Sequence, residues 1–177
     1  MNRVFQEGKK KGQAIIVRQP RDIDACDALI LPGGESTTIS RILNNLGMYN
    51  VIRERMNHHN IAIMGTCAGC VLLAKKLTDA SSDVRLLEAM DIQVERNWYG
   101  RQKESFEQTL QIKGFSTAYH AVFIRAPVIT KTWGDCEILA TAGKKIVMAR
   151  QDKYLALSFH PELTDDLRMH RFFLEML

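Results

Sequence analysis

The stretch Ile61-Ala-Ile-Met-Gly-Thr-Cys-Ala-Gly-Cys-Val-Leu-Leu-Ala-Lys75 organises the interpretation of the whole chain. An apolar run typical of a strand meets Gly65-Thr-Cys-Ala-Gly69, and helix-forming residues follow at once. Gly-x-nucleophile-x-Gly at a strand-to-helix junction is the pattern of a nucleophile elbow, here with Cys67 in place of serine. A helix N-terminus favours the thiolate over the thiol. The stretch therefore predicts a nucleophilic Cys67 with the Ala68 N–H as an oxyanion donor, and the alternative is a buried cysteine in an ordinary strand–helix unit.

The composition is that of an ordinary soluble globular protein. The 177 residues are 46% hydrophobic and 25% charged, which fits one domain over residues 1–177. The net charge of +4 is dispersed, so nucleic-acid binding is not indicated. No apolar run approaches the roughly 20 residues of a membrane span. The N-terminus lacks a secretory apolar region and the four cysteines lack disulfide spacing, so we expect a cytoplasmic protein.

Short apolar runs alternate with helical patterns through the first half of the chain. Strands are expected at 14–17, at 28–31 and from 61, and helices at 1–11, 36–46 and 49–58, with a short helical turn or loop at 22–27. Ser36 or Thr37 is the expected cap of the 36–46 helix. This alternation predicts a doubly wound α/β sheet.

The second half is rich in strands. They are expected at 90–96, 109–113, 121–125, 137–141, 145–149 and 154–158, with turns at 143–144 and 152–153 and a last helix at about 165–177. Some of these strands alternate polar and apolar residues, which favours antiparallel pairing. The predicted sheet is therefore mixed.

Two further segments are expected beside Cys67. Gly33 and Gly34 follow the 28–31 strand, and loops at the carboxyl ends of parallel strands share one edge of the sheet. An ordinary turn is the alternative interpretation. His160 and Glu162 follow the last strand, two positions apart. A nucleophilic cysteine needs a base, and that base needs an acceptor on its second ring nitrogen, so this pair can supply both roles.

The remaining histidines are weaker candidates. His58 and His59 fall at a polar helix end and are expected at the surface, whereas His120 and His170 have no charged or metal-ligand spacing around them. No metal site is expected, because only Cys67 and Cys70 have the spacing of a ligand pair.

Cys67-Ala-Gly-Cys70 also has the C-x-x-C spacing of a dithiol redox site. A thioredoxin-like domain would be smaller and would not need His160 and Glu162. The favoured interpretation makes Cys70 a small apolar filler one helical turn beyond Cys67.

Taken together, these segments resemble the class I (triad-type) glutamine amidotransferases, and among them the glutaminase subunits of pyridoxal 5'-phosphate synthases. The elbow and His-Pro-Glu alone would indicate only the superfamily. Three further segments narrow the resemblance to this subunit: Gly-Gly-Glu-Ser-Thr-Thr, Glu-Arg-Asn and Ile-Arg-Ala-Pro. The matching segments are Leu31-Pro-Gly-Gly-Glu-Ser-Thr-Thr38, Gly65-Thr-Cys-Ala-Gly69, Val94-Glu-Arg-Asn97, Tyr99-Gly-Arg-Gln102, Ser105-Phe-Glu107, Phe123-Ile-Arg-Ala-Pro127 and Ser158-Phe-His-Pro-Glu-Leu-Thr164.

The resemblance implies a role for each matching position. Cys67 would be the nucleophile, His160 the base and Glu162 its orienting partner, with the backbone of Gly34 and Ala68 as the oxyanion hole. The implied glutamine-binding residues are Gly34, Glu35, Ser36, Arg96, Ile124 and Arg125. An arginine at such a site can pair with the α-carboxylate of glutamine.

The implied reaction is hydrolysis of L-glutamine to L-glutamate and ammonia through a γ-glutamyl thioester. Ammonia would pass to a synthase subunit, a (β/α)8 barrel, that builds pyridoxal 5'-phosphate (vitamin B6) from a pentose phosphate and a triose phosphate. The glutaminase of this family has no cofactor, is largely inactive until docked, and assembles as twelve copies of each subunit.

The chain departs from the family pattern at its start. Family members open with an apolar strand, a Leu-Gln-Gly loop and a helix, and this chain begins inside that helix. Roughly the first 20 family residues are thus expected to be absent, which would leave an unpaired sheet edge. Cys70 also stands where the family usually has a larger aliphatic residue. The alternative function is a catalytically impaired scaffold or synthase-binding protein, and a glutaminase of another pathway is disfavoured by the Ile-Arg-Ala-Pro and Glu-Arg-Asn segments.

Overall fold

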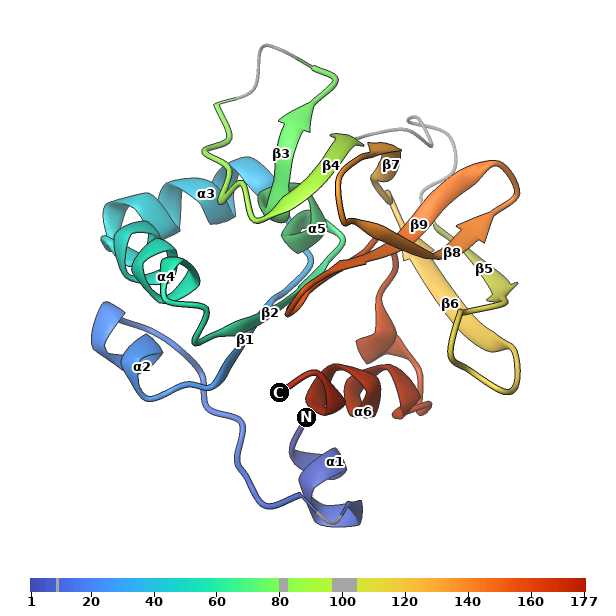
Figure 1. The fold of residues 1–177 in the computed structure, drawn as a ribbon, viewed down its shortest axis with the longest axis horizontal. Helices are drawn as coiled ribbons and strands as arrows, with labels where there is room; N and C mark the ends of the chain where they lie inside the picture. The colour runs from blue at the N-terminus through green and yellow to red at the C-terminus, as the bar shows by residue number, and fades with distance from the viewer. Residues whose placement is uncertain (9, 80–82, 97–104) are drawn as a thin grey trace.

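The fold is built on a mixed sheet with helices on both faces (Figure 1). The computed structural model describes residues 1–8, 10–79, 83–96 and 105–177. Within these residues the main sheet has eight strands, in the order β1-β2-β10-β9-β7-β4-β3 with β8 paired to β9. Their bounds are β1 Ala28–Leu31, β2 Ala62–Thr66, β3 Ala74–Leu77, β4 Met90–Glu95, β7 Val128–Thr132, β8 Glu137–Ala142, β9 Lys145–Gln151 and β10 Tyr154–Leu157. This architecture confirms the predicted mixed α/β sheet.

The strand directions divide the sheet into two parts. β1, β2 and β10 run parallel to one another, whereas β9 is antiparallel to β10 and to β7, and β7 is antiparallel to β4. A separate hairpin joins β5 (Ser105–Leu110) to β6 (Tyr119–Ile124). The expected turn at Gly143 connects β8 to β9, with a positive φ of 60°.

Six α-helices and one 3-10 turn complete the described residues. They are α1 Asn2–Glu7, α2 Pro20–Asp24, α3 Ser36–Asn45, α4 Met48–Asn57, α5 Ala68–Leu73, the 3-10 turn η1 Pro161–Leu163 and α6 Arg168–Glu175. Figure 1 shows α1 beside α6 at the two chain ends. An ion pair of 2.9 Å between Glu7 and Arg171 joins these two helices.

Two apolar cores lie on opposite faces of the parallel strands. Ile63 of β2 packs into the core beneath α3, α4 and α5, whereas Met64 packs into the core that contains α6 and the β5–β6 hairpin. Tyr154 and Leu155 of β10 divide in the same way. Successive side chains of a strand point to opposite faces, so a strand buried on both faces needs a continuous apolar run. This is why β2 and β10 could be recognised as apolar runs, whereas β1 buries Leu29 and Leu31 but leaves Ile30 36% exposed.

The prediction of a strand at 14–17 was wrong. This segment is extended but belongs to neither sheet, and Ile15 and Ile16 are 49% and 76% exposed. The Ala14 N–H donates to the side chain of Asn2 rather than to a neighbouring strand. An apolar run becomes a strand only when a sheet edge accepts its backbone groups, and no such pairing forms here.

Further elements differ from the prediction, and the helix expected at 1–11 covers only Asn2–Glu7. The expected 109–113 strand runs from Ser105 to Leu110. Its first residues are polar and alternate between exposed and half-buried, so no apolar run marks where the strand begins. Strands β3 and β7 were not predicted, since lysines at 75–76 and 131 interrupt their apolar pattern. The α3 cap is Glu35 rather than Ser36 or Thr37.

Candidate active site

Three loops meet at the carboxyl edge of the parallel strands. Leu31 of β1 lies opposite Gly65 of β2, and Leu157 of β10 lies opposite Thr66, so all three strands end at the same level. The chain then continues into Gly33-Gly34, Cys67 and His160, respectively. The expectation that the Gly-rich loop opens beside Cys67 is confirmed. An ideal Cβ on Gly33 would lie 2.4 Å from Cε1 of His160 and 3.4 Å from Cβ of Cys67.

Cys67 occupies a tight turn between β2 and α5. Its φ of 51° and ψ of −106° are unusual for a residue with a side chain, which is typical of a strained elbow. Glycine is required on both sides of it. A Cβ on Gly65 would lie 2.4 Å from the carbonyl of Gly69, and one on Gly69 would lie 2.1 Å from the Leu31 carbonyl oxygen. The strand, the turn and the helix therefore fit together only with glycines at these two positions.

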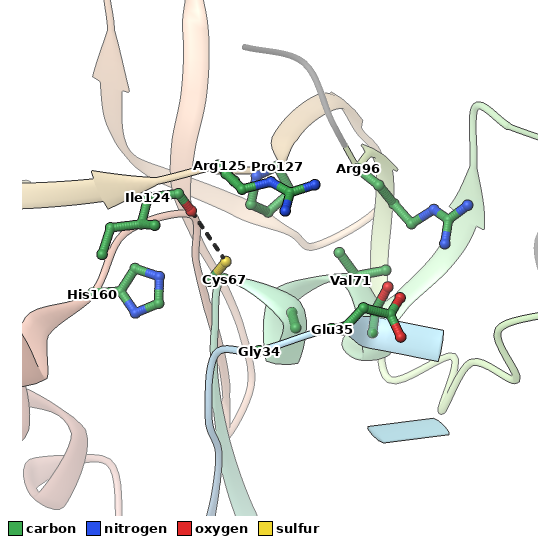
Figure 2. Close-up of a pocket in the computed structure, with 11 residues that line it drawn as sticks. Gly34, Glu35, Cys67, Val71, Arg96, Ile124, Arg125, Pro127 and His160 are labelled. Atoms are coloured by element: carbon green, nitrogen blue, oxygen red, sulfur yellow. Dashed lines mark hydrogen bonds between the residues drawn. The ribbon is translucent and has the colours of Figure 1, made fainter. Parts of the chain in front are cut away.

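His160 lies beside the sulfur and is held from behind by Glu162. Nδ1 of His160 is 2.7 Å from Oε1 of Glu162, whereas Nε2 is buried without a hydrogen-bond partner among the described residues. The Cys67 thiol donates to the Ile124 carbonyl over 3.8 Å, the dashed line in Figure 2. Cys67 and Glu162 together raise the pKa of His160 to about 9. Burial raises the pKa of Glu162, but the hydrogen bonds from His160 and from the backbone, together with the charges of His160 and His170, outweigh burial and lower the pKa. The pair thus favours an imidazolium beside a carboxylate.

A cavity of about 380 Å³ opens above Cys67. Within the described residues it is lined by Gly34, Glu35, Ser36, Cys67, Ala68, Val71, Arg96, Ile124, Arg125, Pro127 and His160. Every expected glutamine-contacting residue is among them, and Glu162 lies behind His160. Val71 and Pro127 also line the cavity and were not predicted from the sequence as site residues. Val71 stands four positions after Cys67, one turn along the same helix face, so helical spacing could have identified it.

Two arginines line the cavity away from His160. Figure 2 shows Cys67 and His160 on one side, Arg96 on the other and Arg125 between them. Arg96, at the end of β4, donates from Nε to Oδ2 of Asp79 over 2.7 Å, and its Nη2 contacts the same oxygen. Arg125 follows β6 with a positive φ of 44°. A cavity with a nucleophile at one end and guanidinium groups at the other suits a small substrate that carries a carboxylate.

Glu35 lines the cavity, but its carboxylate caps α3. It accepts hydrogen bonds from the backbone N–H of Thr37 at 3.0 Å and of Thr38 at 2.6 Å, and from the Thr38 hydroxyl at 2.7 Å. These bonds, led by that of the Thr38 hydroxyl, lower the pKa of Glu35 to about 2. The carboxylate therefore holds the Gly-rich loop against α3.

The other cysteines and histidines lie away from this chemistry. Cys70 is fully buried in the core, and burial raises the pKa of its thiol. His58 and His59 are exposed as expected. His120 was expected to lack a charged neighbour and instead lies 2.9 Å from Oε2 of Glu107 on the paired strand β5. His170 is buried in α6, and burial lowers its pKa.

The described part of the chain offers neither a metal-binding cluster nor a membrane-spanning helix. It contains no cluster of three or more His, Cys, Asp or Glu side chains that could hold a metal ion. None of its helices is both long and apolar enough to cross a membrane. The matching segments at Asn97 and at 99–102 fall outside the described residues.

Comparison with known sequences gives one consistent family. The profile of the SNO glutamine amidotransferase family matches residues 3–177. A protein of Thermotoga maritima named pyridoxal 5'-phosphate synthase subunit PdxT is 48% identical over 166 residues, which cover 93% of this chain and 87% of that protein. The protein of the same name from Sulfolobus acidocaldarius is 42% identical over 182 residues, covering 100% of this chain and 90% of its own length.

Comparison with solved structures agrees. A crystal structure described as a glutamine amidotransferase superposes with a TM-score of 0.88 at 41% identity, covering 99% of this chain and 90% of that one. A second glutamine amidotransferase, from Thermotoga maritima, has a TM-score of 0.61 at 14% identity and supports the fold alone.

Proposed function

This chain belongs to the SNO glutamine amidotransferase family, and on that premise we propose that it hydrolyses L-glutamine to L-glutamate and ammonia. The observation that carries the proposal is the arrangement at the cavity. A cysteine on a strained elbow lies beside a histidine whose far nitrogen is 2.7 Å from a carboxylate, with two arginines at the other end.

Cys67 is the proposed nucleophile and His160 its base. The thiol proton passes to Nε2 of His160, which gives the imidazolium that the raised pKa favours, and the sulfur attacks the side-chain amide carbon of glutamine. The backbone N–H groups of Gly34 and Ala68 stabilise the oxyanion. Ala68 is the first residue of α5, so its N–H has no partner within the helix. The C–N bond breaks as His160 returns the proton to nitrogen, which releases ammonia and leaves a γ-glutamyl thioester.

Hydrolysis of the thioester uses the same groups. His160 takes a proton from water, the hydroxide adds to the thioester carbon, and the C–S bond breaks to give glutamate and the thiolate. Glu162 accepts a hydrogen bond from the Nδ1–H of His160 throughout, which fixes the ring and stabilises the imidazolium. These steps use only groups of this chain and its substrate.

The rest of the cavity recognises the glutamine backbone. Arg96 and Arg125 pair with the α-carboxylate, since guanidinium groups bind carboxylates through charge-assisted hydrogen bonds. Gly34, Ser36 and Ile124 contribute backbone groups along the substrate. Glu35 contributes through the loop that its cap stabilises.

The ammonia is proposed to feed pyridoxal 5'-phosphate synthesis. Relatives that are 42% to 48% identical over most of this chain are named as subunits of that synthase. The proposed partner is accordingly the synthase subunit, a (β/α)8 barrel, in a cytoplasmic assembly of twelve copies of each. Docking on that barrel is the proposed trigger for full glutaminase activity.

Ammonia release from glutamine, measured with the synthase subunit present, tests this function. We expect the wild-type protein to release ammonia and Cys67→Ala to release none above background. Cys26→Ala removes a thiol that does not line the cavity and serves as the matched control. Equal rates for the wild type and Cys67→Ala would refute the proposal, and stable docking without ammonia release would favour a scaffold.

A further inference from the structure

Arg96 does not stand alone at the cavity wall. Its Nε donates to Oδ2 of Asp79 over 2.7 Å, and its Nη2 donates to the same oxygen. Asp79 follows β3, 17 residues earlier in the chain, and is not among the residues that line the cavity. The two side chains are only 20% and 36% exposed, so water screens this pair less than a fully exposed one.

The contact occupies one edge of the guanidinium group. Nε and Nη2 form the edge that Asp79 takes, and Nη1 lies 3.5 Å from the hydroxyl of Thr37, a long contact. A guanidinium presents N–H groups along a second edge, between Nη1 and Nη2, which suits a planar carboxylate. The anchored edge therefore leaves the other edge for a ligand.

We propose that Asp79 is a positioning residue that orients Arg96 to bind the α-carboxylate of glutamine, an inference that rests on the proposed glutaminase function. An arginine side chain has several rotatable bonds, and holding its head in one place before binding reduces the ordering cost of the complex. Asp79 supplies that restraint and touches neither the substrate nor the reacting atoms. It acts on binding more than on the chemical step.

The opposite role is a latch, in which Asp79 competes with the substrate for Arg96. A latch would occupy the edge that the substrate carboxylate needs, whereas Asp79 takes the Nε edge. The two roles predict opposite changes in KM for glutamine when Asp79 is removed. Removing a positioning group raises KM for glutamine, and removing a latch lowers it.

Steady-state glutaminase kinetics of Asp79→Ala with the synthase subunit present provide the test. We expect KM for glutamine to rise about 3- to 10-fold while kcat changes less than about twofold. Asp79→Asn keeps an acceptor oxygen for Arg96 and is expected to recover part of the wild-type KM. Asp83→Ala is the matched control, because Asp83 lies in the same β3–β4 connection and pairs with Arg41, which does not line the cavity.

A double-mutant cycle makes the test specific to Arg96. In an Arg96→Ala background, Asp79→Ala is expected to leave KM unchanged, because the group that it positions is gone. An unchanged or lowered KM in the Asp79→Ala protein, or an equal rise in both backgrounds, would overturn the inference. A wild-type protein that releases no ammonia would instead refute the proposed function, so the two failures are distinguishable.

Discussion

The two ends of the cavity are built by different means. The reacting end, Cys67 and His160, is set by backbone packing among three parallel strands, where glycines allow contacts that a single Cβ would block. The end with Arg96 is set by side-chain pairs that join distant segments. Packed backbone has little freedom to relax, whereas an ion pair between half-exposed groups has more. Substitutions at the reacting end should therefore have severe effects, whereas substitutions at the arginine end should have graded effects.

Removal of the proposed base gives the largest expected effect. His160→Ala should lower kcat by about 10³-fold or more, because the thiol loses its proton acceptor and the leaving nitrogen its proton donor. Ammonia release at saturating glutamine measures it. His120→Ala, which removes an exposed histidine paired with Glu107, should leave kcat unchanged. Equal effects of the two substitutions would contradict the role of His160 as the base.

Adding a methyl group beside His160, in Gly33→Ala, should lower kcat nearly as much as His160→Ala does. The added Cβ of Gly33→Ala would lie 2.4 Å from Cε1 and 3.1 Å from Nδ1 of His160, so the ring must move. A shift of this kind should lower kcat by about 10²-fold. Gly143→Ala is the control, because its Cβ meets nothing within 4 Å and only its backbone at φ 60° is strained. A fall in stability without a fall in kcat would contradict the proposed rigidity.

The dependence of stability on pH should reveal the His160–Glu162 pair. The folded protein raises the pKa of His160 from 6.5 to about 9, through Cys67 first and then Glu162. Between these values the folded state keeps a proton that the unfolded state has lost. The stabilisation is therefore complete below about pH 6.5 and is lost as the pH rises towards 9, by an amount on the order of 2 kcal/mol.

Glu162→Gln removes one of the two groups that raise this pKa, so the decline should flatten. Denaturant unfolding at intervals from pH 6 to 10 measures the free energy of unfolding of both proteins. Parallel curves would mean that Glu162 does not hold the proton on His160.

The same contrast explains what could be predicted from the sequence. Strands β2 and β10 are buried on both faces and β1 packs Leu29 and Leu31 into one core, so their apolar runs were visible, and the loops that follow them carry the expected catalytic residues. The contact of Asp79 with Arg96 could not be predicted, because it depends on the pairing of β3 with β4, and β3 was not predicted. The prediction of a strand at 14–17 was wrong for a related reason. Its composition suits a strand, but pairing depends on the rest of the sheet.

Removal of the α3 cap, at the arginine end of the cavity, should have a moderate effect on stability. Glu35→Ala removes the acceptor for the Thr37 and Thr38 N–H groups and should reduce the free energy of unfolding by about 1 kcal/mol. Glu35→Gln keeps an acceptor and should lose less. Because the pKa of Glu35 is lowered from 4.5 to about 2, its charge stabilises the fold above pH 4.5 and is lost as the pH falls towards 2. Thermal unfolding at pH 7 and pH 3 compares the two variants.

Cys70 gives the smallest expected effect and tests whether the second cysteine belongs to the reacting end at all. Its side chain is fully buried in the core on the α5 side of the sheet, and burial raises its pKa, so it lacks the exposed, low-pKa thiol of a redox cysteine. Cys70→Val keeps a small apolar group and should change stability by less than about 1 kcal/mol. Ammonia release should equal that of the wild type with and without added thiol reductant. If instead the wild type lost activity on mild oxidation and Cys70→Val did not, a Cys67–Cys70 disulfide would be forming, and the reacting end would have a redox chemistry that its packing argues against.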